Sequence, residues 1–483
     1  MSTAVFDNFA APNNQPANFP YGIRIASGNT NGINDIGVAG QRGFGVGICP
    51  RVPTGMGGLQ GYNDPASDNY GNYQYSDGSV MVWIPAFYYK VGTGSNGLVL
   101  NRIDVKPFSA YADIASANAA GYALHRAFYD GGAVQEGFFY DKYITSNNNG
   151  IASSLRNGVV LTSAQRGTIA NTAYATLTGA PANTLGGSIA AAKTRGSNFF
   201  CASLFNFKAV ALLSVAHGQA ATATTYCSWY DATGVKNFPK GNNNNALGDA
   251  QDTAIVYVAD GNGTYAGCGK TGSANLFSRT THNGQNCGVA DQNGLVYEFN
   301  PGLTSDGTNL YILNTAVSMK SVTGSNALAS DLFGATGIAA MYTSIGATYE
   351  SLVKAGGWVY VGNVSSQVFS GATSGNAWNV AGAGIPLAGG VGGTNTFGND
   401  GIYEPASWPA EMAPLSGGAW DDSSGAGGWC LALSRDISIV LVLLTGVDLP
   451  PSADSSTIPE SNRGRSCDAR SGRGGIRLHS EQS

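Results

Sequence analysis

The sequence predicts an α+β fold, because its composition favours loop-rich β structure while two segments carry a helical pattern. Gly occurs 69 times in 483 residues, and charged residues make up only 11% of the chain. Abundant Gly, Asn, Ser, Thr and Tyr with few charges favour short strands and long loops over helical bundles. A hydrophobic content of 43% favours a folded chain over a disordered one.

The first elements are expected to be short strands. Residues 1–75 are rich in Gly, Asn and Pro, and we expect a small β-rich N-terminal domain there for attachment or oligomerisation, with strands at 22–26 and 43–48. Residues 76–483 form the second predicted domain. It opens with SVMVWIPAFYYK at 79–90, an apolar run typical of a strand, in which Pro85 predicts an edge position or a bulge.

Two helices and a series of short strands are expected after this strand. The helices are predicted at residues 155–178 and 199–219. The second is apolar almost all round from Phe199 to Leu213, so we expect it to be buried. Further short strands between long loops are predicted at 254–259, 295–299, 310–312, 358–361 and 402–403.

Charge and cysteine usage limit the class of partner. A net charge of -5 and a pI near 5.4 give no indication of a nucleic-acid partner. We see no signal peptide or lipid anchor, and the longest apolar run, 437–444, is too short to span a bilayer, so no membrane insertion is expected. Seven Cys without CxxC spacing are expected to be buried thiols of a protein made in a reducing cytoplasm.

The one basic cluster lies near the C-terminus. We expect these arginines to form salt bridges that hold the last strand to the core. A ligand-binding patch is the less favoured alternative. The members of the cluster are Arg463, Arg465, Arg470, Arg473 and Arg477.

Motifs for nucleotide, metal or nucleophile chemistry are weak. Residues 261–271 approach a phosphate loop, but Thr264 stands where the loop requires Gly. The four His are far apart, and no HExxH or Gly-x-Ser-x-Gly pattern occurs. The pair Asp421-Asp422 favours a turn, with a structural Ca²⁺ site as the alternative, and no other cofactor is expected.

The most informative stretch begins at Gly417, Gly418, Ala419 and Trp420, here called the frame. No Asn occurs between Asn399 and Asn462, although Asn is abundant elsewhere. Residues 421–459 also contain no Lys, Glu, Gln or Met. This restricted set of residue types indicates a ligand-binding surface whose residues vary while the frame residues stay the same.

Several segments resemble the formylglycine-generating, sulfatase-modifying-factor family. They are HRAFYDGG from His125, GFFYDKY from Gly137, FNFKAVALL from Phe205, GNNNN from Gly241, CGVADQNGLVYEF from Cys287, and the frame. The resemblance covers roughly residues 79–449 and implies a C-type-lectin-like fold of that type. The family's enzymes use a Cys pair just after the frame. Here Asp421, Asp422 and a single Cys430 stand instead, which argues against thiol-dependent oxidation.

The frame and the tract after it resemble the variable proteins of diversity-generating retroelements, including phage tropism determinants. In that family a tract from Gly-Gly-x-Trp to a Gly-x-Arg is altered at template adenines, mostly in Asn codons. Such changes give small, aliphatic, Asp and Arg residues but not Lys, Glu, Gln, Met or Trp. The tract at about 420–459 obeys this restriction after the frame except for Trp429. Gly446-Val447-Asp448 departs from the expected closure, and Gly475-Ile476-Arg477 is a second candidate.

The resemblance implies a non-catalytic receptor-binding protein at the tip of a phage tail fibre. It would be a virion component, a homotrimer joined to other tail proteins, that binds a host cell-surface protein or glycan. The run 437–444 alone favours a buried strand, whereas the resemblance implies a binding face. The residues expected to contact the ligand are Trp420 (more a frame residue than a contact), Asp422, Ser424, Gly425, Trp429, Arg435, Ile437, Ile439 and Leu441.

Two other functions remain open at this point. A formylglycine-type oxidase acting on a sulfatase cysteine would need two thiols close together near Trp420. A purely structural virion protein would show no host binding, and its tract would be identical among sister isolates.

Overall fold

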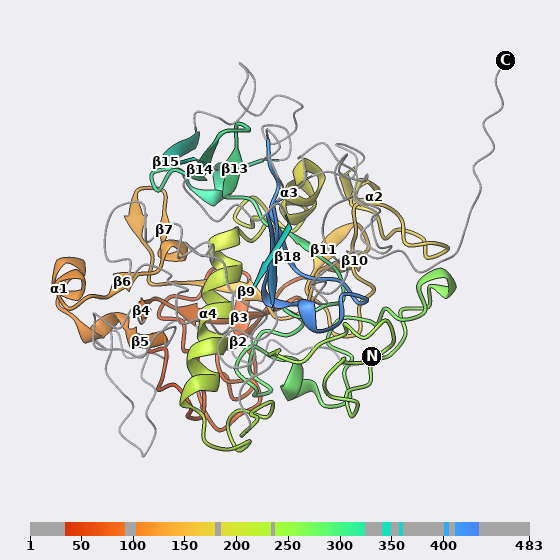
Figure 1. The fold of residues 1–483 in the computed structure, drawn as a ribbon, viewed down its shortest axis with the longest axis horizontal. Coiled ribbons are helices and arrows are strands. Elements are labelled where there is room, and N and C mark those ends of the chain that lie inside the picture. Colours follow the sequence, from red (N-terminus) through yellow and green to blue (C-terminus); the bar gives the residue numbers. More distant parts are fainter. Residues whose placement is uncertain are drawn as a thin grey trace, which may run out of the picture.

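The computed structural model describes residues 34–91, 103–178, 185–232, 237–323, 341–348, 357–360, 400–404 and 411–433. Within these ranges the fold mixes a few helices with several small sheets in which antiparallel pairing dominates (Figure 1), so it is α+β as the composition predicts. None of the helices in this part of the chain has the length and apolar character needed to cross a membrane.

The first sheet contains four antiparallel strands in the order β1 (Met56–Gly58), β2 (Asn72–Tyr75), β3 (Val80–Pro85) and β9 (Gly137–Asp141). The predicted strand at 79–90 is present but divides into β3 and β4. The edge position expected from Pro85 is wrong, because β3 lies between β2 and β9. Pro85 is tolerated because it is the last residue of β3.

Residues 34–75 are built into the same core as the residues that follow them. β2 and β3 form one hairpin, so the predicted domain boundary between residues 75 and 76 falls inside it. Ile36, Phe44 and Tyr70 belong to the core cluster that includes helix α4 (Leu204–Ala220). Residues 43–45 form a turn and only Ile48 makes a bridge, so the strand predicted at 43–48 is absent, and the predicted strand at 22–26 lies outside the described residues.

Helix α4 confirms the second helix prediction. It starts at Leu204 because the Ser203 hydroxyl accepts a hydrogen bond from the Asn206 N–H, while the Asn206 side chain bonds back to Ser203. Every residue from Leu204 to Gly218 is buried, which explains a sequence that is apolar all round. Lys208 and His217 are polar members of this buried helix.

The helix predicted at 155–178 is wrong except for its last turn, α2 (Ala175–Thr178). Asn157 and Asn171 have positive φ angles of 65° and 60°, which a helix does not accept. The Thr172 hydroxyl accepts a hydrogen bond from the Arg166 N–H and so provides a local partner that replaces a helical one. The other helices are α1 (Ile114–Ala119) and α3 (Leu185–Lys193).

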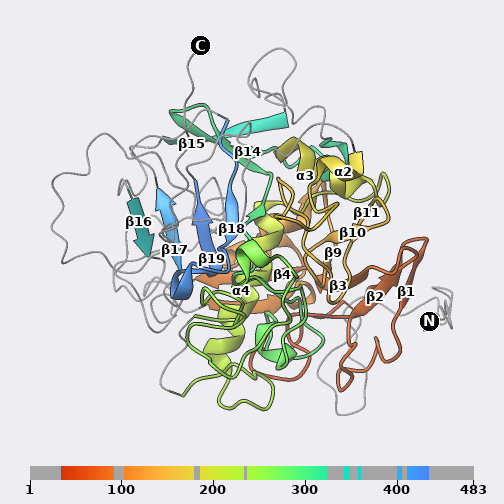
Figure 2. The ribbon, with the colours of Figure 1, turned by 90° about the vertical axis from the view of Figure 1, so that its right-hand side faces the viewer.

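The second large sheet has the order β12 (Glu298–Phe299), β18 (Leu415–Gly417), β19 (Gly427–Ala432), β17 (Gly401–Glu404) and β16 (Gly357–Tyr360). β19 is an interior strand, antiparallel to β18 and parallel to β17. Figure 2 shows β16, β17, β19 and β18 side by side. Three short strands expected near 295–299, 358–361 and 402–403 are thus present as β12, β16 and β17.

The remaining strands form small sheets around these two. Residues 254–259, predicted as a strand, make only isolated bridges through Val256 and Ala259. The strand expected at 310–312 is present in β14. The small sheets are formed by β4 (Phe87–Val91), β5 (Ile103–Pro107) and β6 (Ala123–Leu124); β7 (Tyr129–Asp130) and β8 (Ala133–Val134); β10 (Ser146–Asn148) and β11 (Ile151–Ser153); and β13 (Leu303–Ser305), β14 (Asn309–Leu313) and β15 (Tyr342–Thr348).

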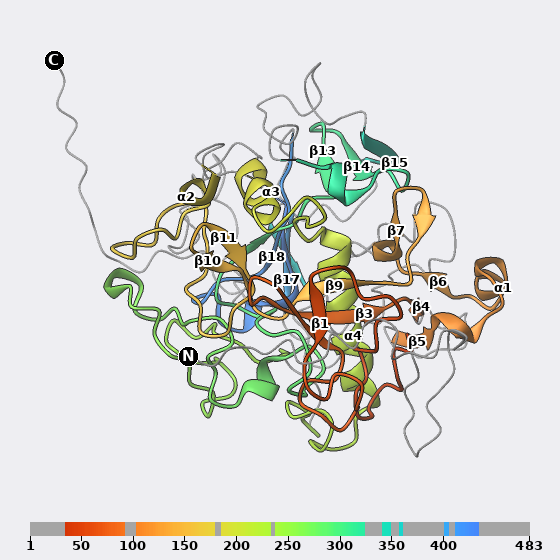
Figure 3. The ribbon, with the colours of Figure 1, turned by 180° about the vertical axis from the view of Figure 1, so that it is seen from behind.

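One hydrophobic core joins the two large sheets through α4. Its buried members include Val82 and Ile84 of β3, Leu212 of α4, and Trp429 and Leu431 of β19. Figure 3 shows the molecule from behind, with β1, β3 and β9 at its centre. Because α4 contributes to the core on which both sheets rest, it fixes the position of β19 and of the turn that precedes it.

Candidate functional site

Two segments that are distant in sequence meet at the frame through main-chain hydrogen bonds. The Gly294 N–H donates to the Gly417 carbonyl at 3.0 Å, and the Trp420 N–H donates to the Leu295 carbonyl at 3.2 Å. The Asn245 N–H donates to the Trp420 carbonyl at 2.9 Å. The Gly/Asn segment, the 291–299 segment and the frame, which the sequence singles out separately, therefore form one bonded unit.

Buried Asn side chains hold this unit together. Asn242 donates to the Gly267 carbonyl at 3.0 Å and accepts from the Gly269 N–H at 2.7 Å. Asn243 donates to the Asn293 side-chain oxygen at 2.8 Å. Asn242, Asn243 and Asn293 have no solvent exposure. Their amides thus replace regular secondary structure in connecting the loops and are not available to a ligand.

Two glycines fix the backbone of the frame and of the strand after it. Gly418 has a φ of 79°, and a Cβ there would lie 2.5 Å from the Ala426 Cβ. Gly427 has a φ of 158°, and its Cβ would lie 2.2 Å from a carboxylate oxygen of Asp400. These close approaches require Gly, so the path of the chain into and out of the turn is sterically determined.

Most of the described residues predicted to contact a ligand are buried instead. Trp420 is 8% exposed and packs in a cluster with Val160 and Leu295, and its role as a frame residue is the one that its burial supports. The carboxylate of Asp422, which is 3% exposed, accepts the Ala419 N–H at 2.6 Å and closes the turn. Gly425 is also buried. The contact role predicted for these residues is corrected to a structural one.

Trp429 is likewise buried, in the interior strand β19. Its N–H donates to the Asp400 carboxylate at 2.7 Å, and the Lys208 ammonium lies 5.7 Å from its ring centroid. Lys208 also donates to the carbonyls of Gly428 and Cys430 at 3.0 and 3.3 Å. Burial raises the pKa of Asp400, which the Trp429 N–H and the Lys208 charge oppose. The tract is therefore anchored to α4 at this point.

Ser424 is the one predicted contact residue in the described part of the chain that keeps partial exposure. It lies in the 3-10 turn Ser423–Gly425, which follows the half-buried Asp421 and the buried Asp422. Burial raises the pKa of Asp421. The other predicted contacts, Arg435, Ile437, Ile439 and Leu441, lie outside the described residues, as do residues 434–459 and the C-terminal Arg cluster.

An exposed loop beside the turn was missed by the sequence prediction. The Ser423 N–H donates to the Asn243 carbonyl at 2.7 Å, which brings the loop after Asn243 next to the turn. We name as the polar rim six residues from these two segments: exposed Asn244, Asn245 and Ala246, and half-buried Asp421, Ser423 and Ser424. The run of four Asn after Gly241 was the available signal, because such runs favour exposed turns.

The groups that would carry metal or nucleophile chemistry have structural roles here. Among the described residues, no group of three or more His, Cys, Asp or Glu is placed to hold a metal ion. His125, His217 and His282 are fully buried, and burial lowers their pKa values to about 3, 4 and 3. Cys430 is a buried free thiol in β19, so the site described here offers no exposed thiol near the frame.

The segment that approaches a phosphate loop is also satisfied internally. The Thr271 hydroxyl and the Gly272 N–H donate to one carboxylate oxygen of Asp291 at 2.7 and 2.6 Å. The residues after Gly272 form turns and a 3-10 helix at Phe277–Thr280 rather than the α-helix that a phosphate loop precedes. These donors hold Asp291 in the core.

Comparisons with known proteins add no relative. A scan against models of protein families finds no match to this chain, and a search of curated proteins likewise finds none. The function is therefore inferred from the residues and their arrangement.

Proposed function

We propose that this chain is a non-catalytic receptor-binding protein with a C-type-lectin-like scaffold of the formylglycine-generating-enzyme type. Its C-terminal tract, residues about 420–459, is a diversified surface of the kind found in diversity-generating retroelement variable proteins. The ligand is a host cell-surface protein or glycan, and the protein acts in the virion at the tip of a tail fibre, joined to other tail proteins.

The main observation in support of this proposal is that main-chain hydrogen bonds hold the frame to its neighbouring segments. The bonds between the frame and its two neighbouring segments join N–H and carbonyl groups, so they do not depend on which side chains follow at 421, 423 and 424. A surface that changes by mutation requires a scaffold whose stability is independent of the changing residues, because most substitutions destabilise a protein that depends on them. The restricted residue types of 421–459 agree with such a surface.

The burial of β19 restricts where the variation is expected. Gly425, Gly427 and Trp429 are buried or sterically fixed, and substitutions there would disturb the core. Asp421 and Ser424 of the polar rim, by contrast, tolerate different side chains because they reach the surface, whereas the positive φ of Ser423, 59°, favours small or polar types such as Asn, Asp, Ser and Gly there. We therefore expect variation at 421, 423 and 424 and beyond residue 433, and constancy within β19.

A homotrimer would strengthen binding by such a surface. Small polar side chains on a rim provide weak contacts, and several copies on one fibre raise the overall affinity without any new contact. The oxidase alternative gains no support from the buried Cys430.

The neighbouring DNA tests the proposal. We expect a reverse transcriptase gene beside a near-copy of the segment that codes for residues 421–459, with the two copies differing at adenines of the template. A coding region without either feature, together with a tract that is the same in every isolate, would favour a purely structural role. Aldehyde formation on a Cys-containing sulfatase peptide would instead establish the oxidase.

A further inference from the structure

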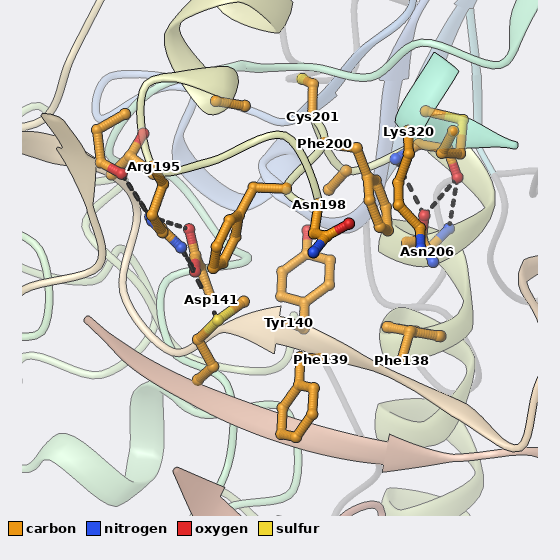
Figure 4. Close-up of a pocket in the computed structure, with 18 of the residues that line it drawn as sticks. Phe138, Phe139, Tyr140, Asp141, Arg195, Asn198, Phe200, Cys201, Asn206 and Lys320 are labelled. Atoms are coloured by element: carbon orange, nitrogen blue, oxygen red, sulfur yellow. Dashed lines mark hydrogen bonds and ion pairs between the residues drawn. The ribbon is translucent and has the colours of Figure 1, made fainter. Parts of the chain in front are cut away.

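A cavity of about 650 Å³ lies between β9, α3, the segment 195–206 and β12, away from the polar rim. Aromatic side chains form much of its wall, among them Phe138, Phe139, Tyr140, Tyr174, Phe199 and Phe200. Figure 4 shows Tyr140 at its centre, with Asp141 and Arg195 on one side and Lys320 on the other. Polar and charged side chains, among them Arg126, Asp141, Arg195, Asn206 and Glu298, complete the lining, and a cavity of this size with aromatic walls is typical of small-molecule sites.

The charged groups of β9 and of the 195–206 segment are largely paired. Arg195 donates to both carboxylate oxygens of Asp141, at 2.6 and 3.0 Å, and to the Ala152 carbonyl. Arg126, at another part of the lining, donates to the carbonyls of Tyr129 and Leu313. These guanidinium groups are already bonded and hold the walls of the cavity in place.

Glu298 is the exception. Its backbone pairs with Ser416 in the second sheet, while its partly buried side chain lines the cavity. In the described part of the chain its carboxyl group makes no hydrogen bond or ion pair. The hydroxyl of Tyr140, another lining group, also lacks a hydrogen-bond partner among the described residues. An ionised carboxyl that is partly removed from water and has no partner is stabilised by a ligand that supplies one.

The groups that face Glu298 are neutral or negative. Tyr140, Tyr174 and Cys201 surround it, and the carboxyl groups of Asp291 and Asp141 act on it from two other segments. Burial, followed by these two carboxyl groups, raises the pKa of Glu298 to about 8.

In the described part of the chain, no cation of the lining forms an ion pair with this carboxyl group. The charges that raise its pKa are those of Asp291 and Asp141. The ionised form of Glu298 therefore has no counter-ion, and a bound anion would destabilise it further.

We propose that this cavity binds an organic ammonium ion, with the positive charge at Glu298 and an apolar body against the aromatic walls. The ammonium group supplies the counter-charge that Glu298 lacks, in a charge-assisted hydrogen bond. The faces of Tyr140, Tyr174 and Phe200 add cation–π and apolar contacts. A neutral ligand such as a sugar supplies no counter-charge and so does not favour the ionised form of Glu298.

This inference is independent of the proposed receptor-binding role. The cavity uses β9, β12, α3 and the 195–206 segment, whereas the polar rim uses the 244–246 and 421–424 segments. Binding of an amine therefore neither requires nor excludes variation in the tract.

Binding of a cation should release a proton. Glu298 is protonated below its raised pKa, and an ammonium ion selects the ionised form. Affinity for an amine should consequently rise about tenfold per pH unit up to about pH 8, where Glu298 is ionised without help, and should level off above it.

Titration calorimetry on the full chain tests the proposal with two probes of nearly identical shape. Tryptamine carries an ammonium group, and tryptophol replaces it with a hydroxyl. We expect tryptamine to bind with proton release and with an affinity that rises with pH, and tryptophol to bind at least about tenfold more weakly.

Two variants locate the charge. Glu298→Gln should lower tryptamine affinity at least about tenfold and abolish proton release. Asp104→Asn, which changes an acid 3.4 Å from Lys106, with both residues outside the cavity lining, should leave affinity within about twofold. Equal binding of the two probes, a pH-independent tryptamine affinity, or no binding of either probe to the wild-type chain would overturn the proposal. The first two results need no variant.

Discussion

At the scale of single residues, the structure depends on positions where the backbone permits one residue type. Gly418 and Gly427 let two chain segments approach more closely than any Cβ allows. Asn242, Asn243 and Asn293 provide side-chain amides where regular strands are lacking. The unusual Gly and Asn content of the sequence thus has a structural cause.

Gly418→Ala should destabilise the protein more than Gly150→Ala does. Both glycines have positive φ angles, 79° and 90°, so each substitution introduces similar backbone strain, about 1 kcal/mol. A Cβ at position 418 would also meet Ala426, whereas nothing lies within 4 Å of one at position 150. Overpacking should add about 1–3 kcal/mol to the loss at 418. Urea unfolding measures the loss in the free energy of unfolding for each variant. Equal losses would show that the turn at Gly418 can shift to accommodate a Cβ.

Glu298→Gln should make stability less sensitive to pH. Because the folded-state pKa of Glu298 is raised from 4.5 to about 8, the folded protein retains a proton that the unfolded chain releases. Stability of the wild-type chain therefore falls as pH rises through this window, and the variant lacks this loss. The Tm of the variant should exceed that of the wild type by an amount that grows from pH 5 to about pH 8 and then levels off. A difference in Tm that does not change with pH would contradict the raised pKa of Glu298.

At the scale of elements, β19 is the strand that connects the frame to the core. It lies between β17 and β18, and its residues are all buried. The buried Lys208 of α4 bonds two of its carbonyls. This arrangement explains why a tract with a restricted set of residue types contains Trp429, a residue type outside that set.

Lys208→Met should weaken this connection. The change retains most of the side-chain volume but removes two hydrogen bonds to β19 and a positive charge that acts on Asp400. The expected loss is about 2 kcal/mol or more. Lys106→Met, at a lysine that is 43% exposed and 3.4 Å from Asp104, should cost less than about 1 kcal/mol. Chemical denaturation compares them, and a neutral Lys208→Met would contradict the anchoring role.

The helices and the site residues also show which features could be predicted from sequence patterns. α4 was predictable because its apolar run follows the capping residue Ser203, so local and tertiary preferences agree. The helix at 155–178 was not, because Asn and Thr side chains bond the backbone locally and turn the chain. Among the site residues, Trp420, Asp422, Gly425 and Trp429 were predicted as contacts, because a resemblance and a restricted set of residue types do not distinguish an exposed variable residue from a buried one beside it.

At the scale of the whole molecule, two sheets and a buried helix hold a turn whose neighbours come from distant parts of the chain. The sequence order of the motifs did not indicate which would meet, because the contacts are made by irregular loops and not by paired strands. The polar rim lies on the 244–246 and 421–424 segments, and the cavity at Glu298 lies on other elements. The two proposed binding sites therefore belong to separate surfaces on one scaffold.

The most direct test of the receptor-binding account is to sequence the coding DNA deeply in a natural population. Two amplicons of similar length should be compared, one for residues 411–459 and one for residues 260–308. The account predicts amino-acid changes concentrated at 421, 423 and 424 and after 433, with the frame and β19 constant and no excess in the second amplicon. A tract as constant as residues 260–308, or changes that fall equally on Gly418 and Trp429, would contradict it.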